Sequence, residues 1–250
     1  MPNSRRTLEL SAREDESLDA VCGVQILQRR SGYRFNLDPV LLAHFSAEAG
    51  LSGPAVDLGT GSGIIPLILA RKFRRTRLVA LELQPRLFEL AERNVQLNRC
   101  ERRVAVVKGD LRLASELFLK QSFAHVLCNP PYHETHTGHL SQESENAIAR
   151  HEVMGSLADF IGAASYLLRH RGSLDLVYPA TRLGALLAAL ELQALVPRLL
   201  RMVHPREGSS AKLVMLRAMK VEHGELDVLA PLVLHPEHAK YTCEVERMLR

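Results

Sequence analysis

The segment "AVDLGTGSGIIP", residues 55–66, places three alternating glycines between a strand pattern and a helix pattern. Gly59, Gly61 and Gly63 allow a tight backbone turn and leave amide N–H groups uncovered by Cβ atoms, so a ligand can approach them closely. This is typical of a nucleotide-type cofactor site. The spacing differs from the G-x-G-x-x-G dinucleotide motif, so the loop taken alone is equally compatible with a plain strand-to-helix turn.

Two carboxylates follow the next two predicted strands. Glu82 ends "RLVALEL", where it can accept hydrogen bonds from both hydroxyls of a ribose, and Asp110 follows "RVAVVKG". Because the carboxyl ends of parallel strands meet at one edge of a sheet, we expect both acids to lie beside the glycine loop. An exposed strand-end carboxylate is the alternative for Glu82.

An acid before G-x-G-x-G, an acid closing the second strand and an Asp closing the third resemble the class I S-adenosylmethionine-dependent methyltransferases. The resemblance implies S-adenosylmethionine as cofactor. It places the glycine loop and Asp57 at the methionine end, Glu82 at the ribose and Asp110 at the adenine amine. It also places Leu83 and Leu111 on the two faces of the adenine ring. The implied cofactor-binding residues are Asp57, Gly59, Thr60, Gly61, Gly63, Glu82, Leu83, Asp110 and Leu111.

The fourth predicted strand, "FAHVLCN", runs into "NPPY", which resembles motif IV of the amino methyltransferases. An adenine amine is a poor nucleophile, because its lone pair is delocalised into the ring, and two hydrogen-bond acceptors would help to align it. The resemblance assigns these acceptors to the Asn129 side chain and the Pro130 carbonyl. Pro131 fixes φ, and Tyr132 offers a ring for base stacking. A simple strand stop is the alternative reading.

The elements that would position these residues alternate regularly between strand and helix patterns from residue 55 onward, which predicts βαβ units and an α/β fold with a parallel sheet. The resemblance implies a Rossmann-like methyltransferase. Its sheet would be mostly parallel and seven-stranded, with a final antiparallel strand and helices on both faces.

The chain is expected to form one domain over residues 18–250, after a mobile tail over residues 1–17. Within this domain we expect a hairpin and helix over residues 18–50, the cofactor-binding core over 51–221 and a C-terminal extension over 222–250. The hairpin is predicted to turn at Arg30 to Gly32. Asp38 is predicted to cap the following helix, with Pro39 in its first turn.

Composition is ordinary for a soluble protein, with 46% hydrophobic and 24% charged residues. No apolar stretch approaches membrane-span length and the N-terminus lacks a secretory pattern, so a cytoplasmic location is expected. The four scattered cysteines are expected to be free thiols. His133, His136 and His139 lack a familiar ligand pattern, so no metal is expected. The net charge of +4 suits an anionic partner only weakly.

Further segments, including "GYRFNLDPVLLAHF", "GTGSGIIPLILA" and "HPREGSSAKLVMLRA", resemble the tRNA(Val) adenine-37 N6-methyltransferases. The resemblance implies a tRNA substrate whose adenine is splayed out of the anticodon loop. Basic residues are candidates for a phosphate-binding rim, and a solvated surface charge is the alternative for each one. The RNA-binding candidates are Arg34, Arg150, His151, Arg206 and Lys212.

Two other functions stay open at this point. A protein-glutamine or ribosomal RNA methyltransferase would present a similar planar amine to NPPY; the glutamine enzymes carry a separate helical domain ahead of the core, which we do not expect here. A cofactor-binding RNA interaction module without turnover is the other alternative. The sequence leaves the oligomeric state open.

Overall fold

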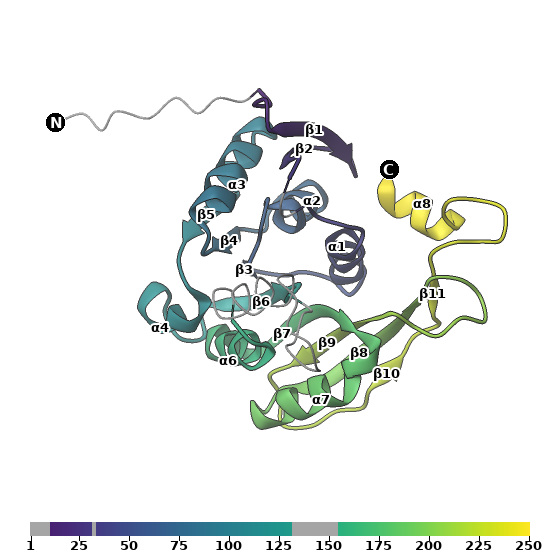
Figure 1. The fold of residues 1–250 in the computed structure, drawn as a ribbon. Helices are drawn as coiled ribbons and strands as arrows, with labels where there is room; N and C mark the ends of the chain where they lie inside the picture. Colours follow the sequence, from purple (N-terminus) through teal and green to yellow (C-terminus); the bar gives the residue numbers. More distant parts are fainter. Residues whose placement is uncertain (1–10, 32–33, 132–154) are drawn as a thin grey trace, which may run out of the picture.

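The computed structural model describes residues 11–31, 34–131 and 155–250, which form a twisted sheet with helices on both faces (Figure 1). In the described chain the sheet has nine strands in the order β10-β8-β9-β7-β6-β3-β4-β5, with β11 also paired to β8. The strands are β3 (Ala55–Leu58), β4 (Leu78–Glu82), β5 (Val104–Lys108), β6 (Phe123–Cys128), β7 (Leu168–Pro179), β8 (Val196–His204), β9 (Leu213–Met219), β10 (Asp227–Val228) and β11 (Leu232–Val233).

The seven expected strands are β3 to β9, and only β9 runs antiparallel to its neighbours β7 and β8. The seven-strand expectation omitted β10 and β11, two-residue strands that extend the β8 edge in parallel. The central strands are buried on both faces; all six residues of β6 are buried, as a parallel sheet covered by helices requires.

Helices cover both faces of the sheet (Figure 1). One hydrophobic cluster includes residues of α1 and α2, and a second includes residues of α6 and α7. The helices are α1 (Asp38–Glu48), α2 (Ile64–Lys72), α3 (Pro85–Leu97), α4 (Ala114–Leu117), α6 (Leu157–Leu167), α7 (Leu183–Leu192) and α8 (Cys243–Leu249), with short 3-10 turns η1 (Leu111–Leu113) and η2 (Ala180–Arg182).

The N-terminal hairpin consists of β1 (Glu16–Val21) and β2 (Val24–Arg29). Its turn lies at Cys22 and Gly23, both with positive φ, so the predicted turn at Arg30 to Gly32 was wrong. β1 begins at Glu16, one residue before the expected end of the tail at residue 17. Residues 1–10 lie outside the described chain, and the expected mobility there stays a prediction.

Helix α1 begins at Asp38, which therefore sits inside the first turn and does not cap it, contrary to the prediction. The Asn36 side chain accepts a hydrogen bond from the Asp38 N–H at 3.0 Å instead. Pro39 occupies the first turn as expected, because a proline there removes an N–H that has no helical partner.

Two asparagines on α3 dock the hairpin onto the helix. Asn98 accepts from the Gln25 N–H at 3.0 Å and donates to the Gln25 carbonyl at 2.6 Å. One turn earlier, Asn94 makes the same pair of bonds to Leu27, at 2.7 and 3.0 Å. The backbone groups of β2 that face away from β1 are thereby satisfied, and β2 runs antiparallel to α3.

The C-terminal helix α8 returns to the hairpin turn. The Cys22 N–H donates to the Leu249 carbonyl at 3.0 Å, and the Cys22 thiol donates to the Met248 carbonyl at 2.8 Å. Val245 and Met248 are buried in the same cluster as α1. All four cysteines are free thiols, as expected.

Candidate functional site

The glycine loop lies between β3 and α2, at the carboxyl edge of the sheet. Gly59, Gly61 and Gly63 have φ values of 71°, 60° and 85°, in the left-handed region that favours glycine. The Gly59 and Thr60 N–H groups both donate to the Leu81 carbonyl at 3.0 Å, which ties the loop to β4. A Cβ atom added at Gly59 would stand 3.4 Å from the Phe160 ring, tighter than most such contacts.

Two buried carboxylates organise this loop, since Asp57 and Glu82 are each only 2% exposed. The Thr60 hydroxyl donates to Asp57 Oδ2 at 2.6 Å. The Gly61 N–H donates to Glu82 Oε2, and the Gln84 N–H to Oε1, each at 2.8 Å. The structure thus brings together the glycine loop and the acid that closes β4, as the sequence predicted.

The second carboxylate oxygen of Asp57 is unsatisfied. Oδ1 is buried and has no hydrogen-bond partner among the residues that the structure describes. Burial raises the pKa of Asp57 from 3.8 to about 7, an effect that the Thr60 hydrogen bond opposes and the neighbouring Glu82 reinforces. A cationic ligand group with N–H donors would satisfy this oxygen and favour the charged carboxylate.

Burial also raises the pKa of Glu82, although backbone N–H groups of Gln84, Gly61 and Leu83 oppose this effect. Glu82 can still accept a hydrogen bond from a ligand hydroxyl while it accepts these backbone hydrogen bonds, because each carboxylate oxygen has more than one lone pair. The geometry of Glu82 is therefore compatible with the ribose contact expected from its place at the end of β4.

A pocket joins the three loops that follow β3, β4 and β5. Its lining is Gly59, Leu81, Glu82, Leu83, Gly109, Asp110, Leu111 and Phe160. Five of these residues were predicted from the sequence. Phe160 was missed, because it comes from α6, about fifty positions after Asp110, and nothing in the local pattern distinguishes it from other core residues of that helix.

Asp110 lies at the rim of this pocket beside Arg112. The Arg112 N–H donates to Asp110 Oδ1 at 2.9 Å, and its guanidinium contacts both carboxylate oxygens. These hydrogen bonds from Arg112 hold the pKa of Asp110 below its ordinary value, so the carboxylate is ionised at neutral pH. An ionised Asp110 can accept a hydrogen bond from a ligand amine.

Asn129, Pro130 and Pro131 follow β6 directly. In the register of the sheet Cys128 faces Leu58, so these residues leave the sheet next to the glycine loop. Asn129 is half-buried and Pro130 buried. Tyr132 lies outside the described residues, so its predicted stacking role is not placed.

The remaining RNA-binding candidates fall in different parts of the chain. Arg34 follows the hairpin and its guanidinium group binds residues of β1: it donates to Asp19 Oδ2 and to the Ser17 hydroxyl, each at 3.0 Å. Arg206 and Lys212 belong to the turn between β8 and β9, and the Lys212 carbonyl accepts from Ala180 just beyond β7, at the carboxyl edge. Arg150 and His151 lie outside the described residues.

Neither a metal cluster nor a membrane-spanning helix was found in the described parts of the chain. In these parts of the chain, His, Cys, Asp and Glu side chains do not gather in groups of three or more that could hold a metal ion. His133, His136 and His139 lie outside the described residues.

A mostly parallel sheet with one antiparallel strand near its end, a glycine loop after β3 and an acid after β4 define the class: a Rossmann-like methyltransferase. The family model of the methyltransferase small domain matches residues 38–185. The chain therefore belongs to the methyltransferase small domain family.

Known proteins agree with this assignment. The chain is 28% identical over 222 residues to the tRNA1(Val) (adenine(37)-N6)-methyltransferase of Porphyromonas gingivalis W83, covering 86% of each chain. It is 24% identical over 225 residues to the Shewanella baltica OS195 protein of the same name, covering 88% of this chain and 91% of the relative.

Solved structures share the fold. A structure described as a predicted O-methyltransferase from Agrobacterium tumefaciens superimposes with a TM-score of 0.68 at 24% identity, covering 84% of this chain and 94% of that chain. Geranyl diphosphate C-methyltransferase from Streptomyces coelicolor A3(2), in complex with S-adenosyl-L-homocysteine, gives 0.53 at 16% identity and covers 72% and 80%.

Proposed function

We propose that this protein transfers a methyl group from S-adenosylmethionine to N6 of an adenine in tRNA, at adenine 37 of tRNA(Val). The observation that carries the proposal is the position of Asn129 and Pro130, which leave β6 next to the glycine loop of β3. The names of the curated relatives support the choice of tRNA as substrate.

The residues of the cofactor pocket fit S-adenosylmethionine. The unsatisfied, buried Oδ1 of Asp57 suits the cationic amino group of the methionine end. Glu82 suits the ribose hydroxyls and Asp110 the adenine amine, while Leu83, Leu111 and Phe160 supply apolar surface for the ring. When bound, the cofactor supplies an activated methyl group on a sulfonium.

Asn129 and Pro130 act on the other reactant. Each presents an oxygen to one N–H of the adenine amine, which orients the nitrogen lone pair away from the ring plane. Neither group needs to be a strong base, because the amine becomes acidic only as the methyl group arrives. Pro131 keeps this backbone rigid, and Tyr132 stacks on the target base.

The RNA approaches along the carboxyl edge. Arg206 and Lys212, in the turn that reaches the end of β7, are placed to contact its phosphates. The adenine must leave its stack to reach Asn129, which a loop permits at lower cost than a duplex. We expect a protein that acts on tRNA in this way to be cytoplasmic.

The decisive experiment is transfer of labelled methyl from S-adenosylmethionine to bulk tRNA from cells that lack this protein. Digestion and nucleoside analysis should recover the label in N6-methyladenosine. Unlabelled tRNA would refute the proposed substrate. The same assay on ribosomes and release factors would then identify a ribosomal RNA or glutamine target, and no transfer to any of them would indicate a binding module.

A further inference from the structure

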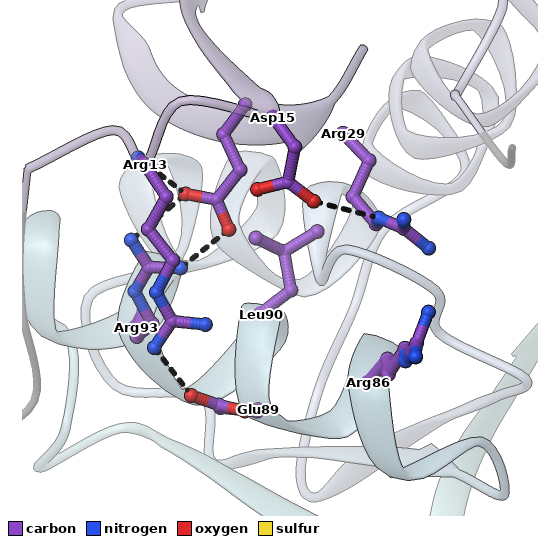
Figure 2. A pocket seen from close by; sticks show the side chains of 8 residues that line it. Arg13, Asp15, Arg29, Arg86, Glu89, Leu90 and Arg93 are labelled. Atoms are coloured by element: carbon purple, nitrogen blue, oxygen red, sulfur yellow. Dashed lines mark hydrogen bonds and ion pairs between the residues drawn. The ribbon is translucent and has the colours of Figure 1, made fainter. Parts of the chain in front are cut away.

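A second pocket lies between the hairpin and α3, away from the residues that line the cofactor pocket (Figure 2). Its volume is about 270 Å³. This is slightly below the range of roughly 300–1,000 Å³ typical of pockets for drug-sized ligands, so it suits a small group. It is lined by Arg13, Asp15, Glu16, Arg29, Arg86, Glu89, Leu90 and Arg93.

One ion pair forms the structural wall of this pocket. Arg93 Nη1 and Nη2 contact Glu16 Oε1 and Oε2 at 2.6 and 2.9 Å, and the two side chains are 0% and 5% exposed. Because this pair is buried and satisfied in bidentate geometry, it is not available to a ligand. It fixes the start of β1 against α3.

The other charged groups of the pocket are open to solvent. Arg13 pairs with Glu89 at 2.6 Å, and Arg29 contacts Asp15 through Nε at 3.5 Å. Arg86 is exposed and makes no ion pair with any residue that the structure describes. Among the pocket residues that the structure describes, three exposed guanidinium groups therefore face two carboxylates.

The two arginines with unused donors lie together. Figure 2 shows Arg29 and Arg86 on the same side of Leu90, with Arg93 and Arg13 on the other. Arg29 uses only Nε for Asp15, so its terminal nitrogens can point toward a ligand. Paired guanidinium groups are well suited to phosphate oxygens, because each presents several N–H donors in a planar fork.

The pocket lies beside the first half of α3, the helix that begins at the carboxyl edge of the sheet. The bonds from Asn98 to Gln25 and from Asn94 to Leu27 show that β2 runs opposite to α3, so Arg29 lies beside the first turns of this helix. α3 begins three residues after Glu82. A ligand between Arg29 and Arg86 would thus flank the reaction site.

We propose that Arg29 and Arg86 bind one backbone phosphodiester of the RNA substrate, outside the segment that carries the target adenine. This inference rests on the proposed function. A backbone phosphodiester carries one negative charge and two non-bridging oxygens, which can accept the N–H donors of two guanidinium groups. Asp15 and Glu89 contact Arg29 and Arg13, respectively, at the rim of the pocket.

The test compares three variants of the full chain. Arg86→Ala should weaken tRNA binding about five- to tenfold at low salt, and should reduce the slope of log affinity against log salt by about one. Asp15→Asn should strengthen binding about two- to threefold, because it removes a negative charge beside Arg29. Arg75→Ala is the matched control: Arg75 is an exposed arginine in the turn before β4, at the opposite edge of the sheet.

Binding is measured by fluorescence anisotropy with labelled tRNA at several salt concentrations, together with KM and kcat for methyl transfer. We expect Arg86→Ala to raise KM for tRNA without changing kcat or S-adenosylmethionine affinity. Arg29→Ala provides a second variant with the same expected result, and thermal melts check that each variant is folded.

Two results would separate the inference from the proposed function. If wild-type protein methylates tRNA and Arg86→Ala behaves like Arg75→Ala, the phosphate site is refuted and the function stands. Weaker tRNA binding by Asp15→Asn would also refute it, since a purely structural Asp15 gives that sign. Wild-type protein that neither binds nor methylates tRNA would overturn both.

Discussion

At the residue scale, Asn129 tests the chemistry most directly. If its side-chain oxygen orients the adenine amine, Asn129→Ala should lower kcat by about 100-fold or more, comparable to loss of a single oxyanion-hole donor, while leaving S-adenosylmethionine affinity within about twofold. Asn129→Asp keeps an acceptor oxygen and should retain more activity than the alanine variant. Single-turnover kinetics and cofactor titration measure the two effects. Equal loss of cofactor affinity and kcat would assign Asn129 to the cofactor pocket instead.

Asp57 gives a prediction about pH. Its pKa rises from 3.8 to about 7 on folding, so the folded protein without cofactor binds a proton that the unfolded chain releases at lower pH. The associated stability is present at low pH and is lost as pH rises toward about 7, at roughly 1.4 kcal/mol per unit. Asp57→Asn mimics the protonated acid and should therefore be more stable than wild type at pH 8, with a smaller difference at pH 5.

The same carboxylate should make cofactor binding depend on pH. A cationic amino group binds the ionised form, so the Kd of wild type for S-adenosylmethionine should rise as pH falls below about 7, up to tenfold per unit. Asp57→Asn should bind weakly at every pH. Urea unfolding and calorimetric titration at pH 5 and 8 test both effects, with the exposed Asp227→Asn as control. A wild-type Kd that does not vary between these values would contradict the assignment.

Site residues whose positions are set by the local backbone, at strand ends and in turns, were predictable from the sequence. Site residues that are brought together by packing between distant elements were not. The positions of Gly59, Gly61 and Glu82 follow from strand ends and turn geometry, which spacing along the chain reveals. Phe160 lies against Gly59 because α6 packs over the sheet. Arg29 and Arg86 share a pocket only because β2 docks on α3. Such neighbours depend on packing, which leaves no local signature.

At the scale of elements, α3 connects the hairpin to the cofactor loop. Asn94 donates to the Ser62 carbonyl at 2.9 Å in addition to its two bonds with Leu27, whereas Asn98 contacts Gln25 and its own helix. Both asparagines hold β2, but only Asn94 also holds the glycine loop. Substituting each asparagine in turn therefore distinguishes docking of the hairpin from positioning of the glycine loop.

Asn94→Ala should destabilise the protein by roughly 1–3 kcal/mol, because it leaves buried backbone groups unsatisfied, and should raise the Kd for S-adenosylmethionine about tenfold or less. Asn98→Ala should destabilise by a smaller amount and leave cofactor affinity within about twofold, since Gln25 is closer to solvent. Denaturant unfolding and cofactor titration measure the two quantities. Equal cofactor affinities in the two variants would show that the hydrogen bond from Asn94 to the Ser62 carbonyl does not position the glycine loop for cofactor binding.

The errors in element prediction have identifiable causes. "RRSG" carries a stronger turn composition than "VCGV", yet the chain turns at Cys22, a residue type that rarely adopts the observed φ of 52°. The bonds between Cys22 and the last turn of α8 favour this turn, and they join residues more than two hundred positions apart. The predicted cap of α1, Asp38, lies one position after the true N-cap, Leu37. The error arises because acidic residues are favoured both at the cap and in the first turn of a helix.

At the scale of the whole molecule, the mostly parallel sheet with one shared carboxyl edge was the most predictable feature. Regular alternation of strands and helices implies parallel strands that share one carboxyl edge, and the observed register places Leu58, Leu81 and Cys128 side by side. The strands β10 and β11 were not predictable, because two-residue strands have no periodicity. They pair with β8 in parallel, and Leu232 of β11 is buried in the hydrophobic core, after which the chain continues to α8.

The return of α8 to the hairpin makes the two ends of the described chain parts of one structure, and this predicts how the protein unfolds. Val245 is fully buried in the cluster that also contains α1 and α2, so Val245→Ala should lower the free energy of unfolding by about 2 kcal/mol. Since no residue of α8 lines the cofactor pocket, cofactor affinity should stay unchanged. If residues 18–250 fold as one domain, far-UV circular dichroism and tyrosine fluorescence should report a single, coincident urea transition that shifts as a whole in the variant. Two separate transitions, with only the earlier one displaced by Val245→Ala, would mean that the hairpin and C-terminal extension unfold independently of the cofactor-binding core.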